Sequence, residues 1–140
     1  MKRKLLVIDT SVMVKWVNSQ DENYLDQANK ILKDTQDGKV ELLTTELAKY
    51  EVANALLYKN MGLPQTKASL GTIYALPIEF HPLSAESAEE TLIIAHENKI
   101  TYYDAAFISL AKEKNATLIT ANPKHQRQFP GLKVIDISNY

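Results

Sequence analysis

The chain has 140 residues, which fits one ordinary domain, and its composition of 45% hydrophobic and 24% charged residues is typical of a globular protein. The absence of cysteine excludes disulfides, thiolate zinc sites and cysteine nucleophiles. Sixteen basic residues against seventeen acidic ones give a net charge of -1. Any nucleic-acid binding must therefore come from a local patch or a bound metal rather than from bulk positive charge.

The N-terminal apolar run stops at Asp9, short of the roughly 7–15 apolar residues of an export signal. No apolar stretch approaches the roughly 18 residues that span a bilayer. We therefore expect a cytoplasmic protein without a membrane segment. No linker, repeat or low-complexity stretch divides the sequence, which predicts a single domain over residues 1–140.

Strands and helices are predicted to alternate along the chain. Residues 5–8 form a short apolar run typical of a strand buried on both faces of a parallel sheet. The patterns that follow predict a short helix at 12–17, a helix at 21–37 that Asp21 starts and Gly38 closes, and a strand at 40–44. Helices are then predicted at 46–61 and 65–74, with a strand at 78–80. The rest of the chain predicts helices at 84–98 and 101–114, which begin at Ser84 and Thr101, and strands at 117–120 and 133–137. This alternation predicts an α/β fold with a central, mostly parallel sheet flanked by helices.

Three carboxylates interrupt apolar surroundings, and Asp9 is the first. It directly follows the first predicted strand, at the sheet edge where open α/β sheets bind ligands. An aspartate after a strand also commonly caps the next helix, so capping is an equally ordinary explanation.

Glu51 is the second carboxylate. Helical spacing places it beside Leu47, Ala55 and Tyr58 rather than in a charged stripe. Lys49 lacks the three- or four-residue spacing of a helical ion pair, and so does Lys59. The alternative is a stray glutamate on a long helix.

Asp104 is the third carboxylate, and it lies three residues after Thr101, as in a capping box. The same helix aligns it with the apolar Phe107 and Ile108, which capping alone does not explain. Both roles are compatible.

Common catalytic motifs are absent from the sequence. Neither a paired-histidine zinc motif, nor a glycine-rich nucleotide loop, nor a G-x-S-x-G elbow occurs, and His81, His96 and His125 are isolated from one another. A receiver module and a D-x-D phosphatase are also excluded, because Thr10 and Ser11 follow Asp9 and no acidic pair flanks the first strand.

The order and spacing of four short motifs resemble a PIN domain, as in the VapC-type toxins of toxin–antitoxin pairs. These motifs are DTS at 9–11, EVANAL at 51–56, YDAA at 103–106 and LITAN at 118–122, and the resemblance runs over residues 5–137. It implies a Mg²⁺- or Mn²⁺-dependent endoribonuclease with Asp9, Glu51 and Asp104 as its acidic metal-site residues. It also implies accompanying roles for Ser11 and Thr120.

Asn122 departs from this pattern, because such proteins commonly carry an aspartate there. Its amide oxygen is still a candidate metal ligand but adds no negative charge, which leaves a second metal and full activity open. The alternative function is therefore a catalytically weak or inactive PIN-like module that binds RNA or protein.

The resemblance further implies a homodimer and a cognate antitoxin, while RNA would be the substrate. Three basic residues near the motifs, Lys15, Lys124 and Arg127, are expected to contact RNA phosphates. The sequence does not specify which RNA or which bond is cut.

Overall fold

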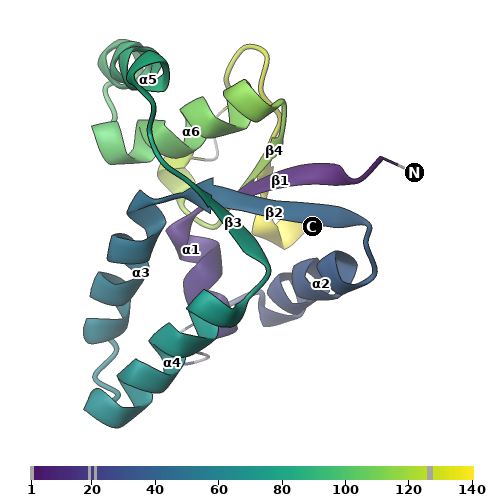
Figure 1. Ribbon diagram of the computed structural model, residues 1–140, viewed down its shortest axis with the longest axis vertical. Helices are drawn as coiled ribbons and strands as arrows, with labels where there is room; N and C mark the ends of the chain where they lie inside the picture. The colour runs from purple at the N-terminus through teal and green to yellow at the C-terminus, as the bar shows by residue number, and fades with distance from the viewer. Residues whose placement is uncertain (1, 19, 21, 126–127) are drawn as a thin grey trace.

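A single five-stranded sheet forms the centre of the computed structural model, which describes residues 2–18, 20, 22–125 and 128–140 (Figure 1). The strands lie in the order β3-β2-β1-β4-β5, and all four neighbouring pairs are parallel. Their bounds are β1 Lys4–Ile8, β2 Val40–Thr45, β3 Ile78–His81, β4 Thr117–Thr120 and β5 Val134–Asp136. The predicted α/β class is confirmed, with a wholly parallel sheet.

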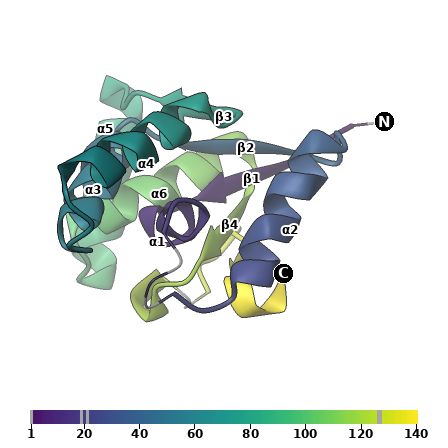
Figure 2. The ribbon, with the colours of Figure 1, turned by 90° about the horizontal axis from the view of Figure 1, so that it is seen from below.

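Helices cover both faces of the sheet (Figures 1 and 2). The helices α5 (Ala85–Asn98) and α6 (Tyr102–Lys114) lie on one face, where α6 contacts β1, β2 and β4. The other face carries α1 (Thr10–Met13), α2 (Leu25–Gln36), α3 (Leu47–Leu57) and α4 (Leu63–Ala75). Because β1 is covered on both sides, Leu6, Val7 and Ile8 are fully buried, as their continuous apolar run predicts.

Helix boundaries show where the sequence patterns were incomplete. The first long helix begins at Leu25 rather than at 21, after Tyr24 in a left-handed conformation, and Asp21 lies outside the described residues. The helix α3 ends at Leu57, short of the predicted Met61. The helix α4 begins two residues early, because Pro64 in its first turn needs no hydrogen-bonded N–H.

The capping predictions at the starts of α5 and α6 are confirmed. The Ser84 hydroxyl accepts the N–H of Ser87, and the Thr101 hydroxyl accepts the N–H of Asp104. Short 3-10 turns at Val14–Trp16 (η1), Pro123–His125 (η2) and Ile137–Asn139 (η3) complete the chain. None of the helices in the described residues is both long enough and apolar enough to cross a lipid bilayer.

The parallel register brings the segments after β1 and β4 to one edge of the sheet. Ile8 pairs with Ile119, and the backbone N–H of Asp9 donates to the carbonyl of Ile119 at 3.4 Å. On the other side of β1, the hydroxyl of buried Thr44 donates to the Ile8 carbonyl at 2.6 Å. Residues that follow Ile8 and Thr120 are therefore held as neighbours by the sheet itself.

Candidate active site at the carboxyl edge of the sheet

Asp9 is buried at the carboxyl end of β1, with 2% of its surface exposed. Its Oδ1 accepts a hydrogen bond from Ser11 Oγ, and its Oδ2 accepts one from Thr120 Oγ1 at 2.5 Å. The side chain makes no capping hydrogen bond to α1, where the Asp9 carbonyl accepts the N–H of Val12 instead. Capping therefore does not explain why a carboxylate is buried here.

Ser11 and Thr120 connect the ends of β1 and β4 through the same carboxylate. Ser11 Oγ accepts the N–H of Ala121 at 3.0 Å, and Thr120 Oγ1 accepts the N–H of Asn122 at 2.9 Å. Each hydroxyl thus donates a hydrogen bond to the Asp9 carboxylate and accepts one from a backbone N–H of the loop after β4. This arrangement fixes the rotamer of Asp9 from both sides.

Glu51 reaches the same edge from α3 and is half-buried. Its Oε1 accepts a hydrogen bond from Thr10 Oγ1 at 3.0 Å. Burial raises the pKa of the Glu51 carboxyl above its usual range, and the negative charges of Asp104 and Asp9 raise it further. The three carboxylates therefore lie within electrostatic reach of one another, and we call Asp9, Glu51 and Asp104 the acidic cluster.

Asp104 lies in the first turn of α6, at the carboxyl edge of the sheet. Its backbone N–H donates to Thr101 Oγ1 at 3.0 Å, which caps the helix. Its carboxylate Oδ1 lies 3.0 Å from Nε2 of His125. The Thr101 hydroxyl thus caps the helix, and the Asp104 carboxylate faces His125.

His125, which the sequence analysis set aside, lies between two of the acids. It is 2% exposed; its Nδ1 is 2.9 Å from Asp9 Oδ2 and its Nε2 faces Asp104. Burial opposes protonation, but the hydrogen bond to Asp9 and the charges of Asp9 and Asp104 outweigh it, so the pKa of His125 is raised. His125 follows Thr120 by five residues at the same sheet edge, but no local sequence pattern marks it as part of the site.

The donors at this edge are oxygen atoms of the kind that Mg²⁺ and Mn²⁺ prefer. Within the described residues, no three acidic or histidine side chains already form a metal-binding group. Mg²⁺ needs only one or two direct carboxylates, because water completes its coordination. The carboxylates of Asp9, Glu51 and Asp104 supply oxygen donors of this kind at one sheet edge, so the residues present fit such an ion.

Asn122 shapes the loop after β4. Its side-chain Oδ1 accepts the N–H of Lys124 at 3.1 Å, and its carbonyl accepts the N–H of His125 at 2.9 Å. The amide therefore forms a local turn that orients both following residues. In this arrangement one lone pair of Oδ1 is already used.

The three predicted RNA contacts differ in position. Lys124 is exposed on η2, beside Asp104. The ammonium of Lys15 lies 3.1 Å from Glu22 and donates to the carbonyl of Asn23, with only 6% of its side chain exposed. Arg127 lies outside the described residues. Lys15 is thus held inside the protein, and its ammonium is already used by Glu22 and Asn23.

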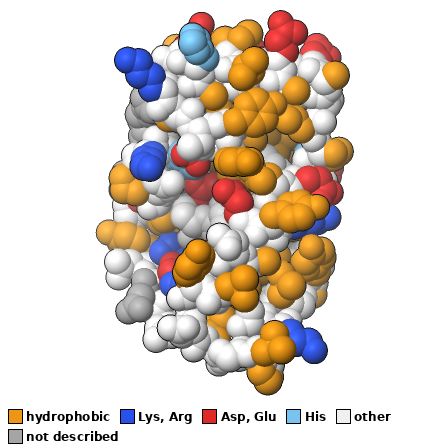
Figure 3. Space-filling model, turned by 90° about the vertical axis from the view of Figure 1, so that its left-hand side faces the viewer, with side chains coloured by type: hydrophobic (Ala, Val, Ile, Leu, Met, Phe, Trp, Pro, Cys, Tyr) orange, Lys and Arg blue, Asp and Glu red, His pale blue; other side chains and the backbone are white. Residues whose placement is uncertain are grey.

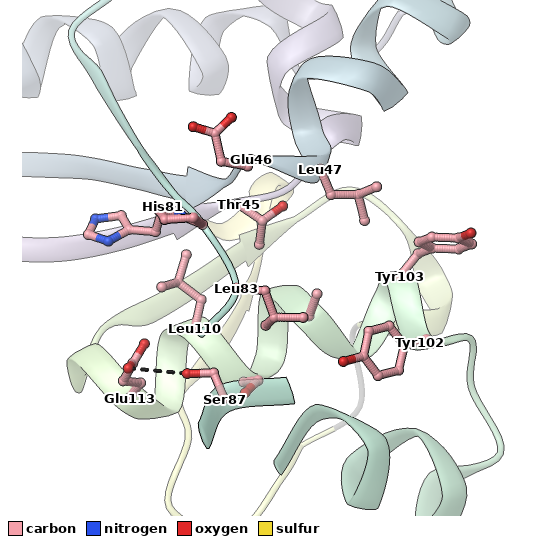
Figure 4. Close-up of a pocket in the computed structure, with 13 residues that line it drawn as sticks. Thr45, Glu46, Leu47, His81, Leu83, Ser87, Tyr102, Tyr103, Leu110 and Glu113 are labelled. Carbon is pink, nitrogen blue, oxygen red and sulfur yellow. Dashed lines mark hydrogen bonds between the residues drawn. The ribbon is translucent and has the colours of Figure 1, made fainter. Parts of the chain in front are cut away.

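The face at the carboxyl ends of the strands combines acidic and apolar side chains. Acidic side chains gather near the middle of this face, and hydrophobic side chains lie above and below them (Figure 3). A separate cavity of about 190 Å³ lies between the start of α3, the segment after β3 and α6, with Leu47, Leu83 and Tyr102 in its lining (Figure 4). Its walls are mainly apolar and contain no member of the acidic cluster, so it is distinct from the candidate active site.

Comparison with known proteins agrees with this arrangement. The PIN domain family matches residues 6–130. Ribonuclease VapC3 of Pyrobaculum aerophilum is 30% identical over 132 residues, which cover 91% of this chain and 96% of that protein. The fold and these similarities define a PIN-domain protein.

Solved structures show the same fold. VapBC2 from Rickettsia felis, crystallised with a promoter DNA fragment, aligns with a TM-score of 0.70 at 20% identity and covers 94% of this chain and 98% of that one. A toxin–antitoxin complex from Klebsiella pneumoniae aligns with a TM-score of 0.66 at 17% identity, covering 91% and 94%. The chain belongs to the PIN-domain family, in its VapC-type ribonuclease group.

Proposed function

We propose that this chain is a Mg²⁺- or Mn²⁺-dependent endoribonuclease that hydrolyses RNA phosphodiester bonds with the acidic cluster. One observation supports this most strongly. Asp9, Glu51 and Asp104 come from β1, α3 and α6 to one sheet edge, and no lysine or arginine among the described residues forms an ion pair with them. The similarity to ribonuclease VapC3 supports the same reaction.

Electrostatics explains why such a cluster favours a cation. Two carboxylates about 4 Å apart repel by about 4 kcal/mol at an effective dielectric constant near 20. The burial of Asp9 increases this effect, and His125 offsets only part of it. A divalent cation would remove the repulsion, so the cluster is a site whose stability depends on binding.

Each residue then has a defined task. When bound, the cation acidifies a water molecule and neutralises charge on the phosphate. Asp9 and Asp104 would hold the ion, and Glu51 would hold it directly or through water and would orient the water molecule that attacks the phosphate. Ser11 and Thr120 keep Asp9 in its rotamer. Asn122 positions the loop and has one free lone pair for the ion or its water.

We also propose that the chain acts as the toxin of a toxin–antitoxin pair and forms a homodimer. The related Klebsiella pneumoniae structure is a toxin–antitoxin complex, which supports a protein partner. Light scattering of the purified chain tests the dimer. Co-expression with the product of the neighbouring open reading frame tests the partner, which should suppress RNA cleavage.

One observation favours a second function. Because Asn122 stands where an aspartate is common, the chain has less negative charge for a second metal, and a weak or inactive RNA-binding module is the alternative. Such a module would bind RNA without cleaving it.

A nuclease assay separates these functions. Purified protein with Mn²⁺ should cleave structured RNA, and EDTA or Asp104→Asn should abolish cleavage. Asp26→Asn, the same change on the exposed surface of α2, is the matched control and should retain activity. Equal residual activity in the wild type and Asp104→Asn would identify a contaminating nuclease and contradict the proposal.

A further inference from the structure

A groove of about 460 Å³ lies beside Asp104, between the α5–α6 junction and η2. Its lining residues are Lys99, Ile100, Thr101, Asp104, Pro123 and Lys124. Asp104 is the only acid among them, and a lysine belongs to each wall. The groove therefore joins the acidic cluster to a surface of opposite charge, and we call it the Lys99–Lys124 groove.

The two lysines of this groove are not used in the protein's own ion pairs. Eight basic side chains elsewhere are paired with Asp or Glu, namely Arg3, Lys15, Lys30, Lys33, Lys39, Lys49, Lys59 and Lys112. Other exposed lysines, such as Lys67 and Lys133, are unpaired in the part of the chain that the structure describes but lie away from the acidic cluster. Lys99 and Lys124 are both exposed, and within the described residues neither ammonium forms an ion pair. Two cations thus face one groove without an internal partner.

The backbone of both walls is tied to the acidic cluster, through hydrogen bonds on the Lys124 side and through the chain itself on the Lys99 side. The N–H of Lys124 donates to Asn122 Oδ1, and the N–H of Asn122 donates to Thr120 Oγ1, which itself donates to Asp9. On the opposite wall, Lys99 lies two residues before Thr101, which caps the N–H of Asp104. The backbones at Lys99 and Lys124 therefore hold a set position relative to the proposed metal ligands.

The backbone at Lys99 gives an independent indication. Lys99 ends α5 in the left-handed conformation, with φ of 54°, a position that favours glycine or asparagine. The corresponding position at the end of α6 is occupied by an asparagine, Asn115, with φ of 51°. A lysine in this conformation is unfavourable for folding, which is common where a side chain has a function.

We propose that the Lys99–Lys124 groove binds a backbone phosphodiester of the RNA strand next to the bond that is cut. This inference rests on the proposed ribonuclease function and adds the side of the site along which the strand runs. Phosphate contacts fix register without reading sequence. The groove should therefore affect RNA affinity and KM for all sequences, with little effect on kcat.

Binding measurements test this groove directly. Fluorescence anisotropy with a labelled single-stranded RNA and Mn²⁺, in an Asp9→Asn background that prevents cleavage, gives Kd over a range of salt concentrations. Lys99→Glu and Lys124→Glu should each weaken binding and lower the slope of log Kd against log salt by about 0.7. Lys67→Glu and Lys133→Glu, on α4 and before β5, are matched controls and should leave both values unchanged.

A second variant separates binding from folding. Lys99→Asn suits the left-handed backbone, so it should keep or raise the melting temperature while it weakens RNA binding. An unchanged Kd and an unchanged salt slope in the Lys99 and Lys124 variants would overturn the proposed role of the groove in RNA binding, even if the wild type cleaves RNA. Failure of the wild type to cleave RNA would instead overturn the proposed ribonuclease function. Reduced RNA binding in the Lys99 and Lys124 variants would still support the groove as an RNA-binding surface.

Discussion

Two clusters of charged residues lie at opposite ends of the same sheet. At the amino end, Asp34 accepts a hydrogen bond from the Tyr140 hydroxyl at 2.7 Å and lies 3.3 Å from Lys30 and 3.9 Å from Lys39. At the carboxyl end, His125 is the only basic side chain among the described residues that forms an ion pair with the acidic cluster. The same residue types are thus balanced at one end and unbalanced at the other.

The pKa values at the two ends shift in opposite directions. The hydrogen bond from Tyr140, followed by Lys30 and Lys39, lowers the pKa of Asp34, although burial opposes this. Burial and the neighbouring acids raise the pKa of Glu51. The amino end therefore stabilises its own charge, whereas burial and neighbouring acids disfavour the charge of Glu51 at the carboxyl end, and such perturbed groups cluster at functional sites.

The largest expected difference concerns removal of one carboxylate from each end. Asp9→Asn should reduce RNA cleavage more than about 100-fold, because it removes a metal ligand from the site. Asp34→Asn should leave cleavage unchanged and lower the free energy of unfolding by about 1 kcal/mol, because the Tyr140 hydrogen bond weakens. Cleavage rates and urea unfolding of both variants measure this, and an active Asp9→Asn would remove the functional distinction between the ends.

A smaller effect is expected from the hydroxyl that orients Asp9. Ser11→Ala should reduce cleavage by about 10–100-fold, since second-sphere contacts position a ligand rather than replace it. Ser138→Ala, on η3, is the matched control. If Ser11→Ala cleaved RNA as fast as Ser138→Ala, the hydroxyl would have no part in positioning Asp9.

Asn122→Asp is expected to strengthen the charge imbalance at the carboxyl end. Aspartate keeps the acceptor for the Lys124 N–H, so the loop should retain its turn. The added charge should tighten Mn²⁺ binding by about tenfold, as measured by calorimetry. Unchanged or weaker Mn²⁺ binding would show that position 122 does not face the ion.

The smallest expected effect is a difference in pH dependence without metal. The raised pKa of His125 stabilises the fold below the unfolded value near 6.5, and this contribution is lost as pH rises through the folded value. The lowered pKa of Asp34 acts in the opposite sense, because its contribution is lost as pH falls through the folded value, below 3.8. Melting curves in EDTA should show a smaller fall in melting temperature at high pH for His125→Gln and a smaller fall at low pH for Asp34→Asn. Identical pH profiles for the two variants would contradict this.

Most of the fold follows from local sequence patterns, and the exceptions have physical causes. Residues 5–8 and 117–120 were predicted as strands because continuous apolar runs suit a sheet covered on both faces. The start of α2 was misplaced because Tyr24, rather than a polar capping residue, precedes it. Capping signals at Ser84 and Thr101 gave correct helix starts because a side chain makes the bond.

The acidic residues of the candidate site were predictable from the sequence, but His125 was not. The three acids were found because carboxylates stand out in apolar patterns, and the register of β1 and β4 then brings Asp9 next to the β4 loop. His125 was missed, since its contacts to Asp9 and Asp104 span 116 and 21 positions of the chain and leave no local spacing. Lys15 was predicted to contact RNA but pairs with Glu22 instead. The sequence did not reveal this ion pair, because Glu22 lies in a loop where no helix or strand pattern places it.

The central claim is that the acidic cluster exists to hold a divalent cation. Calorimetric titration of Mn²⁺ into metal-free wild-type protein and into Asp104→Asn tests this most directly. We predict saturable binding to the wild type, with a stability gain of about 2.7 kcal/mol at one hundred times Kd, and loss of that binding in Asp104→Asn. The absence of Mn²⁺ binding to the wild type, or equal binding to both proteins, would contradict the claim.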